Sequence, residues 1–288
     1  MVSQFRRAAV GALTVTAKRL LAEAVKASGR KATVQIAGEY AWKQTPSQST
    51  TDLSKLFALG EAPMKLYLTL VMLTRKPPHA LYRARPDHYW AEMLGYEELD
   101  DRRPTPGAGT RRIKRAFAVL GSAGPRGASM VTRTPEPGYG ARITVPVHPP
   151  QPPKTLRGPY ITIPIELWSR GWINVLSARA LFVYLCLRLV LAGRPEAEGA
   201  HVSIWDRENF CIKDDTWERG FKDLEALGLA RGKVEDAVQA DRWSTDRLYK
   251  RKVYYLNRTF LQMTDAPDGA DDLVEGGVAA VPPRVPRY

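Results

Sequence analysis

Apolar residues recur at helical spacing along much of the chain, and the clearest case lies between Thr110 and Gly121. Ile113, Phe117 and Leu120 stand at positions i, i+4 and i+7, which places them on one stripe of a helix. The stretch is therefore expected to form a short amphipathic helix that buries this stripe. Similar spacing, bounded by Pro, Gly or capping residues, predicts further helices over residues 64–75, 86–94, 178–191 and 214–227.

Short β-prone runs around polar turns predict two hairpins. Residues 160–163 are expected to add an edge strand ahead of the second one. Ser177 and Asp214 are the expected N-caps of the helices that follow them. Helices followed by a hairpin occur twice in this order, so we predict an α+β fold of two similar domains. The predicted strand pairs are 129–133 with 141–145 and 229–234 with 249–256.

A proline-rich segment, VPVHPPQPPK from Val145 to Lys154, separates the two sets of elements. Proline at this density favours a stiff, extended chain over a helix or a central strand. The segment is thus expected to be a linker. The predicted parts are a basic N-terminal helical extension (1–53), a first domain (54–146), the Pro-rich linker (147–159), a second domain (160–262) and a disordered tail (263–288).

The positive charge of the chain is concentrated in its first half. The 288 residues carry a formal net charge of +13. Residues 1–150 hold 23 Lys and Arg against 11 Asp and Glu, whereas residues 151–288 hold 20 against 19. This asymmetry indicates that one domain binds a polyanion, which is either a nucleic acid or an anionic membrane surface.

A membrane partner is the weaker interpretation. The most apolar stretch, Ala178 to Ala192, is shorter than the ~20 residues that a bilayer span requires, and Arg188 interrupts it. The basic stretch 5–28 resembles an export signal only faintly, because Lys18 and Arg19 follow its apolar run without a small-residue cleavage site. Two cysteines form neither a disulfide framework nor a zinc-site spacing, so we expect a cytoplasmic protein.

The predicted helix at 110–121 has the chemistry of a DNA recognition helix. Phosphates would take up its charge, and arginine forks hydrogen-bond to guanine edges in the major groove. We assign base edges to Arg111 and Arg115, and phosphates to Arg112 and Lys114. Thr110 is the expected N-cap and a further phosphate contact. The alternative is a solvated surface helix. The cations that lie off the apolar stripe, and are expected to face outward, are Arg111, Arg112, Lys114 and Arg115.

Other cations of the first domain are candidates for the same surface. Arg83 and Arg85 precede the helix at 86–94 and are expected to contact phosphates. Arg133 and Arg142 lie in the first hairpin and are expected to contact the DNA backbone or the minor groove. The alternative for each is an exposed charge without a partner. Large aromatic side chains are more often core than base-stacking residues, and this expectation covers Trp168, Trp172 and Trp205.

The second set of elements repeats features of the first. A helix that closes in Leu-Gly and leads into a hairpin resembles the winged-helix class of DNA-binding proteins, and plasmid replication initiators often hold two such domains in one chain. The resemblance covers about residues 54–146 and 160–262. It implies two winged-helix domains, each a helix-turn-helix plus a β-hairpin, that bind double-stranded DNA. Arg112, Arg115 and Leu120-Gly121 are matched 107 positions later by Arg219, Lys222 and Leu227-Gly228.

The second predicted recognition helix differs from the first in its charge. Its carboxylates outnumber its cations Arg219 and Lys222, and phosphates repel acidic groups. Two interpretations remain open. The second domain contacts DNA through the hairpin residues Lys250, Arg251 and Lys252, or it forms a homodimer that mirrors a palindromic site. The two interpretations are compatible with each other.

The sequence lacks the features of an enzyme. It has no Gly-rich phosphate loop with Lys-Ser/Thr, and its four histidines form no metal-ligand pair. We expect no catalysis, metal or cofactor. The expected function is sequence-specific binding of double-stranded DNA by a plasmid or phage replication initiator that recruits replication machinery. The alternatives are a transcriptional or copy-number repressor that engages transcription machinery and, from another class, a protein-interaction module with incidental DNA contact.

Overall fold

The computed structural model describes residues 13–96, 107–122, 129–136, 140–146, 160–239 and 247–267. The predicted Pro-rich linker (147–159) lies outside these residues, as does the predicted tail beyond residue 267. Helices and small antiparallel sheets alternate along the described chain, so the α+β prediction is confirmed at this level. No helix in the described part is long and apolar enough to cross a membrane.

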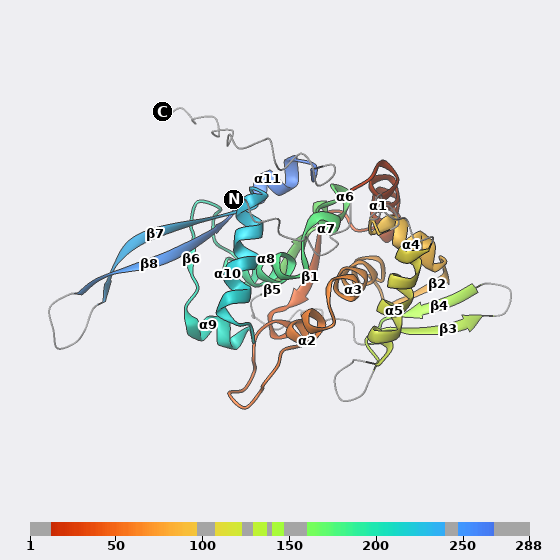
Figure 1. Cartoon of the computed structure of the whole chain (residues 1–288), viewed down its shortest axis with the longest axis horizontal. Helices are drawn as coiled ribbons and strands as arrows, with labels where there is room; N and C mark the ends of the chain where they lie inside the picture. Colours follow the sequence, from red (N-terminus) through yellow and green to blue (C-terminus); the bar gives the residue numbers. More distant parts are fainter. Residues whose placement is uncertain are drawn as a thin grey trace, which may run out of the picture.

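Within the described residues, the first unit consists of three helices and a three-stranded antiparallel sheet (Figure 1). Its sheet has the order β2-β4-β3, and Ile143 of β4 lies opposite both Leu81 of β2 and Arg133 of β3. The predicted helices and hairpin are confirmed, whereas β2 was not predicted from the sequence. The elements are α3 (Glu61–Leu73), β2 (Ala80–Ala84), α4 (Asp87–Met93), α5 (Ala108–Ser122), β3 (Thr132–Glu136) and β4 (Gly140–Thr144).

The second unit has the same order of elements as the first. Ser177 caps its first helix as predicted, because its hydroxyl accepts a hydrogen bond from the Ala180 N–H at 3.2 Å. The expected cap Asp214 is wrong: Lys213 occupies the N-cap position, and Asp214 is the first helical residue, where its charge favours the helix dipole. The elements are α8 (Ala178–Val190), β6 (Ala200–His201), α9 (Ile204–Asn209), α10 (Asp214–Ala226), β7 (Ala230–Gln239) and β8 (Arg247–Leu256), with the sheet order β6-β8-β7.

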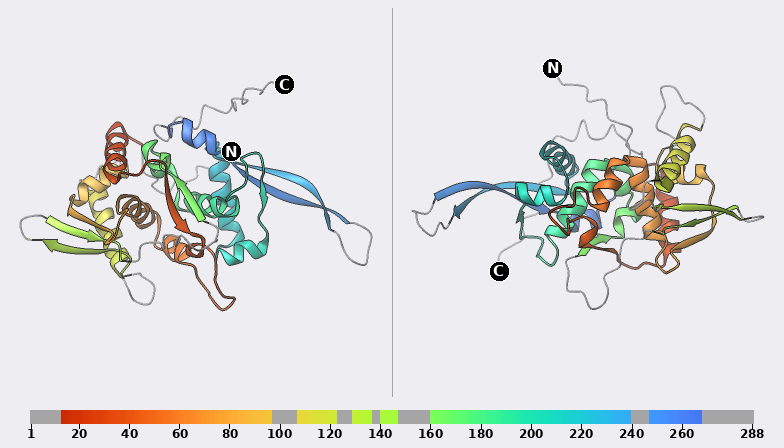
Figure 2. Two further views of the ribbon diagram at one scale, coloured as in Figure 1. Left: turned by 180° about the vertical axis from the view of Figure 1, so that it is seen from behind. Right: turned by 90° about the horizontal axis from the view of Figure 1, so that it is seen from below.

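The hairpin of the second unit is longer than the sequence predicts. Its strands extend beyond the predicted pair 229–234 and 249–256, and their pairing runs from Ala230 opposite Leu256 to Gln239 opposite Arg247. Figures 1 and 2 show that the hairpins β3–β4 and β7–β8 extend from opposite ends of the molecule. The two units therefore present separate surfaces.

Strand β1 from the N-terminal part and strand β5 from the segment after residue 160 lie in the middle of the molecule, whereas α1 lies beside α4 of the first unit (Figures 1 and 2). Strands β1 and β5 pair in antiparallel fashion, with Val34 opposite Ile163, so the strand predicted at 160–163 has its partner within the predicted extension 1–53. Arg30 donates hydrogen bonds to the carbonyls of Met72 and Val71 at the end of α3. The remaining elements are α1 (Val15–Ser28), β1 (Thr33–Ala37), the 3-10 helix η1 (Gly38–Tyr40), α2 (Asp52–Ala58), β5 (Tyr160–Pro164), α6 (Glu166–Ser169), α7 (Trp172–Val175) and α11 (Arg258–Met263).

One hydrophobic core continues from the first unit through the middle into the second. Trp168 is fully buried, and its Nε1 donates a hydrogen bond to Thr69 Oγ1 of α3 at 3.2 Å. Trp172 is buried as well, so the core prediction is confirmed for both residues. It is wrong for Trp205, whose side chain is 64% exposed because the short helix α9 buries none of its residues.

Candidate nucleic-acid interface

Helix α5 has the two faces that its sequence predicts. Ile113, Phe117 and Leu120 are buried. Arg111, Lys114 and Arg115 are exposed, and their i, i+3 and i+4 spacing places them beside one another on the helix surface. Gly107, with φ +71, immediately precedes the helix and turns the chain into it. The helix is therefore anchored by its apolar stripe and carries a continuous cationic face.

On this face, the charges of Lys114 and Arg115 are uncompensated among the described residues. Within the described ranges, no carboxylate forms an ion pair with Lys114 or Arg115. The side chains of Lys114 and Arg115 are exposed, so their donors are directed to solvent. An exposed cluster of like charges raises the local potential and attracts polyanions. This face has the electrostatic property that phosphate binding requires.

Two of the predicted site residues of α5 are placed differently from the prediction. Arg112 is only half exposed, because its guanidinium lies 4.4 Å from the ring centre of the buried Tyr96. Thr110 does not cap the helix: α5 begins at Ala108, which makes Thr110 the third helical residue. Arg112 is thus held against the body of the first unit, while Arg111, Lys114 and Arg115 face outward.

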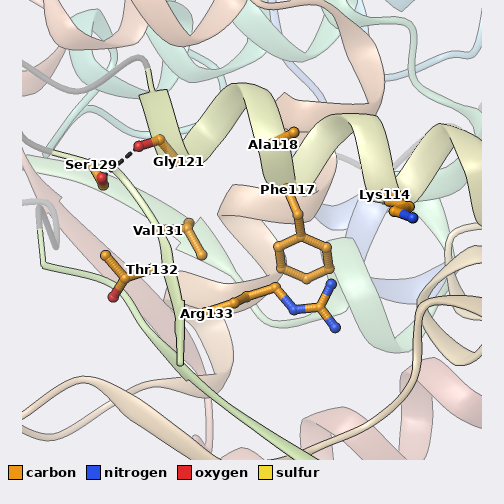
Figure 3. A pocket seen from close by; sticks show the side chains of 8 residues that line it. All are labelled: Lys114, Phe117, Ala118, Gly121, Ser129, Val131, Thr132 and Arg133. Atoms are coloured by element: carbon orange, nitrogen blue, oxygen red, sulfur yellow. Dashed lines mark hydrogen bonds between the residues drawn. The ribbon is translucent and has the colours of Figure 1, made fainter. Parts of the chain in front are cut away.

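A shallow hollow of about 380 Å³ lies between α5 and the first strand of the hairpin (Figure 3). The Arg133 guanidinium from β3 lies 4.5 Å from the ring centre of Phe117, and its Nη1 donates to Asp87 Oδ1 of α4 at 2.8 Å. Lys114 borders the same hollow from the helix. Arg133 therefore joins three elements, and one carboxylate partly compensates its charge.

The remaining cations of the first unit lie on or beside its sheet. The Arg142 guanidinium on β4 lies 4.7 Å from the ring centre of the exposed Tyr82 on β2, and its Nη2 donates to the Tyr82 hydroxyl. Arg83 is exposed, and its φ of +59 coincides with the shift in register between β2 and β4. Arg85 is exposed and lies 5.5 Å from the Tyr89 ring centre. Aromatic rings thus hold two of these three guanidinium groups in place.

The cations predicted in the second unit fall into two groups. Arg219 pairs with Asp215 at 3.0 Å, and Lys252 pairs with Glu218 at 2.8 Å, so helix α10 supplies carboxylates to both. Burial acts to raise the pKa of Glu218, but hydrogen bonds from Lys252 and Tyr254 outweigh it and hold the pKa below its ordinary value. The second group is exposed and consists of Lys222, Lys250 and Arg251.

Sequence reasoning missed the residues that hold the predicted cations. Asp87, Tyr82 and Tyr96 each contact an arginine that lies far away in the sequence or on another element. The acidic residue at the start of a predicted helix is the only signal for Asp87, and it indicates helix capping as readily as a partner for arginine. Their roles emerge only when the fold brings the elements together.

No family model, curated protein or solved structure matches this chain. In the part of the chain that the structure describes, no three His, Cys, Asp or Glu side chains gather in a metal-binding cluster. The assignment of function accordingly depends on the geometry and charge of the molecule itself.

Proposed function

We propose that this chain binds double-stranded DNA in a sequence-specific manner, with α5 as the recognition helix of a winged-helix unit. The observation that carries the proposal is the cationic face of α5, on which Lys114 and Arg115 are exposed and have no ion-pair partner among the described residues. Helix α4 lies before α5 and the hairpin β3–β4 follows it, which is the order that a winged-helix unit requires. Such a helix is narrow enough to enter the major groove.

The exposed cations of α5 divide into two roles under this proposal. Arg111 and Arg115 are one turn apart and would form hydrogen bonds with base edges, whereas Lys114 would bind phosphate beside the hollow. Arg112 lies on the half-buried side against Tyr96 and would reach a phosphate at the edge of the groove. Arg133 and Arg142 on the hairpin extend the same basic surface, and would contact the backbone or a narrow minor groove.

The biological role that we propose is initiation of plasmid or phage replication, without catalysis. Its support is the repeated order of helix, strand, helix, helix and hairpin in the two units, together with the resemblance of the sequence to two-domain initiators. Repression of transcription is the competing role. Iterated target sites beside the gene would favour initiation, and a single palindrome overlapping the promoter would favour repression.

Selection of bound duplexes from a random pool, at near-physiological salt, tests the proposal. We expect enrichment of a defined motif, and a Kd that rises steeply with salt concentration. Arg115→Ala should then weaken binding to the selected site by roughly 1–3 kcal/mol and relax preference at one base pair. Lys114→Ala should weaken binding to all sequences alike and lower the salt slope by about one.

The chain supplies its own control for this experiment. Lys222 occupies the position in α10 that Arg115 occupies in α5, and it is likewise exposed. Lys222→Ala should leave motif preference unchanged, since α10 carries carboxylates that phosphates repel. Binding without an enriched motif would reduce the surface to non-specific attraction. Equal losses in the Arg115 and Lys222 variants would mean that α10 contributes to recognition as much as α5, and would contradict the assignment of recognition to α5 alone.

A further inference from the structure

The edge strand β2 of the first unit presents Tyr82 and Arg83 to solvent at a β-bulge. The register between β2 and β4 shifts there, so that both residues lie opposite the single residue Arg142. Consecutive residues of a regular strand point to opposite faces, but here both side chains are exposed, that of Tyr82 by 60%. The φ of +59 at Arg83 is a conformation that few residues with a side chain adopt. Bulges re-aim side chains beside functional sites, so this one indicates a binding surface.

The Arg142 guanidinium holds the Tyr82 ring in place. It lies 4.7 Å from the ring centre, and its Nη2 donates to the Tyr82 hydroxyl at 3.3 Å. The guanidinium covers one face of the ring, and the exposure of the side chain leaves the other face open to solvent. A ring that is positioned before its ligand arrives loses less conformational entropy on binding. We call Tyr82, Arg83 and Arg142 the bulge surface.

Carboxylates do not balance the positive charge of the bulge surface. Strands β2 and β4 contain no Asp or Glu, and the exposed Arg85 follows β2 directly. Among the residues that the structure describes, neither Arg85 nor Arg142 forms an ion pair. The next acidic residue along the chain, Asp87, pairs with Arg133 on β3. Glu136 at the end of β3 leaves one carboxylate against three arginines, so the surface remains cationic.

A second stack of arginine on tyrosine, in the second unit, shows the opposite arrangement. The Arg231 guanidinium lies 4.7 Å from the ring centre of Tyr255, but Tyr255 is only half exposed. Its hydroxyl donates to Glu235 at 2.9 Å, which places a carboxylate at the stack. A carboxylate at this position repels phosphates. The two features of an open ring and an uncompensated arginine therefore occur together at the bulge surface and not at this second stack.

We propose that the bulge surface binds a single-stranded nucleic acid, with an unpaired base stacked on the open face of Tyr82 and phosphates on Arg83 and Arg85. An exposed aromatic ring among cations combines the two features of single-strand surfaces, because every base has a π-face and every linkage carries a phosphate. Bases inside a duplex are already stacked on both faces, so the ring selects an unpaired strand. An acidic peptide would satisfy the arginines but would leave the ring without a partner. This inference goes beyond the binding of duplex DNA by α5 and does not rest on it.

Fluorescence anisotropy of the full chain with labelled oligothymidylate of about 12 nucleotides, at near-physiological salt, tests the inference. Tyr82→Ser should raise the Kd at least about fivefold, because the stacking of one base is lost. Tyr82→Phe keeps the ring and should bind within about twofold of wild type. An oligomer of the same length without bases carries the same phosphates, so wild type and Tyr82→Ser should bind it equally. Oligouridylate offers the same chemistry, and the tighter of the two oligomers identifies DNA or RNA as its source.

An exposed aromatic residue in the second unit provides the matched control. Trp205 on α9 is 64% exposed, so Trp205→Ser removes a comparable ring and should leave oligothymidylate binding unchanged. Because Tyr82 and Trp205 are both largely exposed, circular dichroism should show that both variants fold. Arg115→Ala separates this inference from duplex recognition, since it should weaken binding to the selected duplex and leave the effect of Tyr82→Ser on oligothymidylate unchanged. Failure of either proposal is thus distinguishable from failure of the other.

Three outcomes would overturn the inference. Equal binding of oligothymidylate by wild type and Tyr82→Ser would show that the ring does not contact a base. Equal losses with the intact and the base-free oligomer would mean that Tyr82 acts by positioning Arg142 and not by stacking. Polyglutamate that displaces oligothymidylate at a similar concentration of charges would assign the bulge surface to an acidic protein segment.

Discussion

Lys65 Nζ donates a hydrogen bond to the backbone carbonyl of Asn174 at 2.6 Å and thereby joins α3 to α7. Both side chains are completely buried. The Lys65 ammonium also pairs with Glu61 Oε1 at 3.1 Å, and Asn174 Nδ2 donates to the Met93 carbonyl at the end of α4 at 3.1 Å. A buried polar network thus connects the first unit to the segment that leads into the second.

Replacing Lys65 with Met should destabilise the protein strongly. The substitution keeps most of the side-chain volume, but it leaves the nearly buried Glu61 carboxylate and the Asn174 carbonyl without their shared donor. Loss of one member of a buried ion pair costs about 3–5 kcal/mol, and urea unfolding of the variant should show a loss of this size. Adding Glu61→Gln should recover part of it, because the uncompensated charge is then removed.

A surface lysine one helix away is the matched control for this experiment. Lys55 of α2 pairs with Asp52 at 3.1 Å, and both side chains are about one-third exposed. Lys55→Met should change the free energy of unfolding by less than about 1 kcal/mol. Similar losses in the two variants would mean that lysine substitution, and not the buried network, explains the effect.

Lys65 should also give the protein a pH dependence of stability in the alkaline range. Burial lowers the pKa of Lys65 from 10.5 to about 8, although the charge of Glu61 acts to raise it. Between these two values the unfolded chain holds a proton that the folded state has released, so stability rises with pH there. Below about pH 8 both states hold the proton, and Lys65 contributes no slope.

The difference between wild type and Lys65→Met isolates this contribution from other titrations. Tyr96, which contacts Glu61, has its pKa raised by burial, so tyrosine ionisation lowers stability at higher pH in both proteins. Urea midpoints measured at pH 7 and pH 9.5 should show wild type gaining stability relative to the variant. A constant difference across this range would show that Lys65 does not titrate in it.

Asp87 is predicted to limit the affinity of the basic surface for DNA. Its carboxylate pairs with Arg133 beside the hollow, so Asp87→Asn should keep a hydrogen-bond acceptor while removing the compensating charge. We expect binding to duplex DNA at low salt to tighten by about two- to tenfold, and the salt slope to steepen by about one. Fluorescence anisotropy across a salt series measures both quantities.

The corresponding change in the second unit serves as the comparison. Asp223 of α10 pairs with Arg179 at 2.7 Å, and Asp223→Asn removes a carboxylate of similar exposure far from α5. Its DNA affinity should match that of wild type. Weaker binding by Asp87→Asn would contradict the prediction and would mean that the carboxylate acts by positioning Arg133.

The sequence was sufficient to predict elements whose stability is local. Helix α5 shows its apolar stripe and its basic face in consecutive residues, and Ser177 caps α8 through a hydrogen bond to a residue three positions on. Strand β1 could not be recognised in this way, because it pairs with β5 more than a hundred residues later. Strand β2 is short and broken in register at Arg83, so its five residues show no alternation.

The sequence predicts which cations of the candidate site are exposed, but not which residues contact them. The outward direction of Arg111, Lys114 and Arg115 follows from helical spacing alone. The contacts of Arg133 with Asp87 and of Arg112 with Tyr96 depend on tertiary packing. Trp205 was expected in the core because of its size, but α9 buries none of its residues. The type of a residue predicts how buried such residues are on average. Whether one particular side chain is buried depends on the helices and strands that pack against it.

Gly220 of α10 should be intolerant of even a methyl group. Positions in α10 match positions in α5 at an offset of 107 residues, so Gly220 corresponds to Ile113. The second unit therefore has glycine where α5 has a residue of its apolar stripe. A Cβ at Gly220 would lie 2.6 Å from the Arg179 carbonyl oxygen and 2.8 Å from a methyl carbon of Val183, because α10 packs closely on α8. Gly220→Ala should lower the free energy of unfolding by about 1–3 kcal/mol, since backbone on one side must move.

Gly121 near the end of α5 is the control, because a Cβ there would make only an ordinary contact, 3.7 Å from the Val131 carbonyl oxygen. Gly121→Ala should stabilise the protein by up to about 1 kcal/mol, since alanine loses less backbone entropy in a helix than glycine. Thermal unfolding of the two variants should therefore shift the Tm in opposite directions. If Gly220→Ala unfolded at the wild-type temperature, α10 and α8 could not be as close as the packing of the second unit requires.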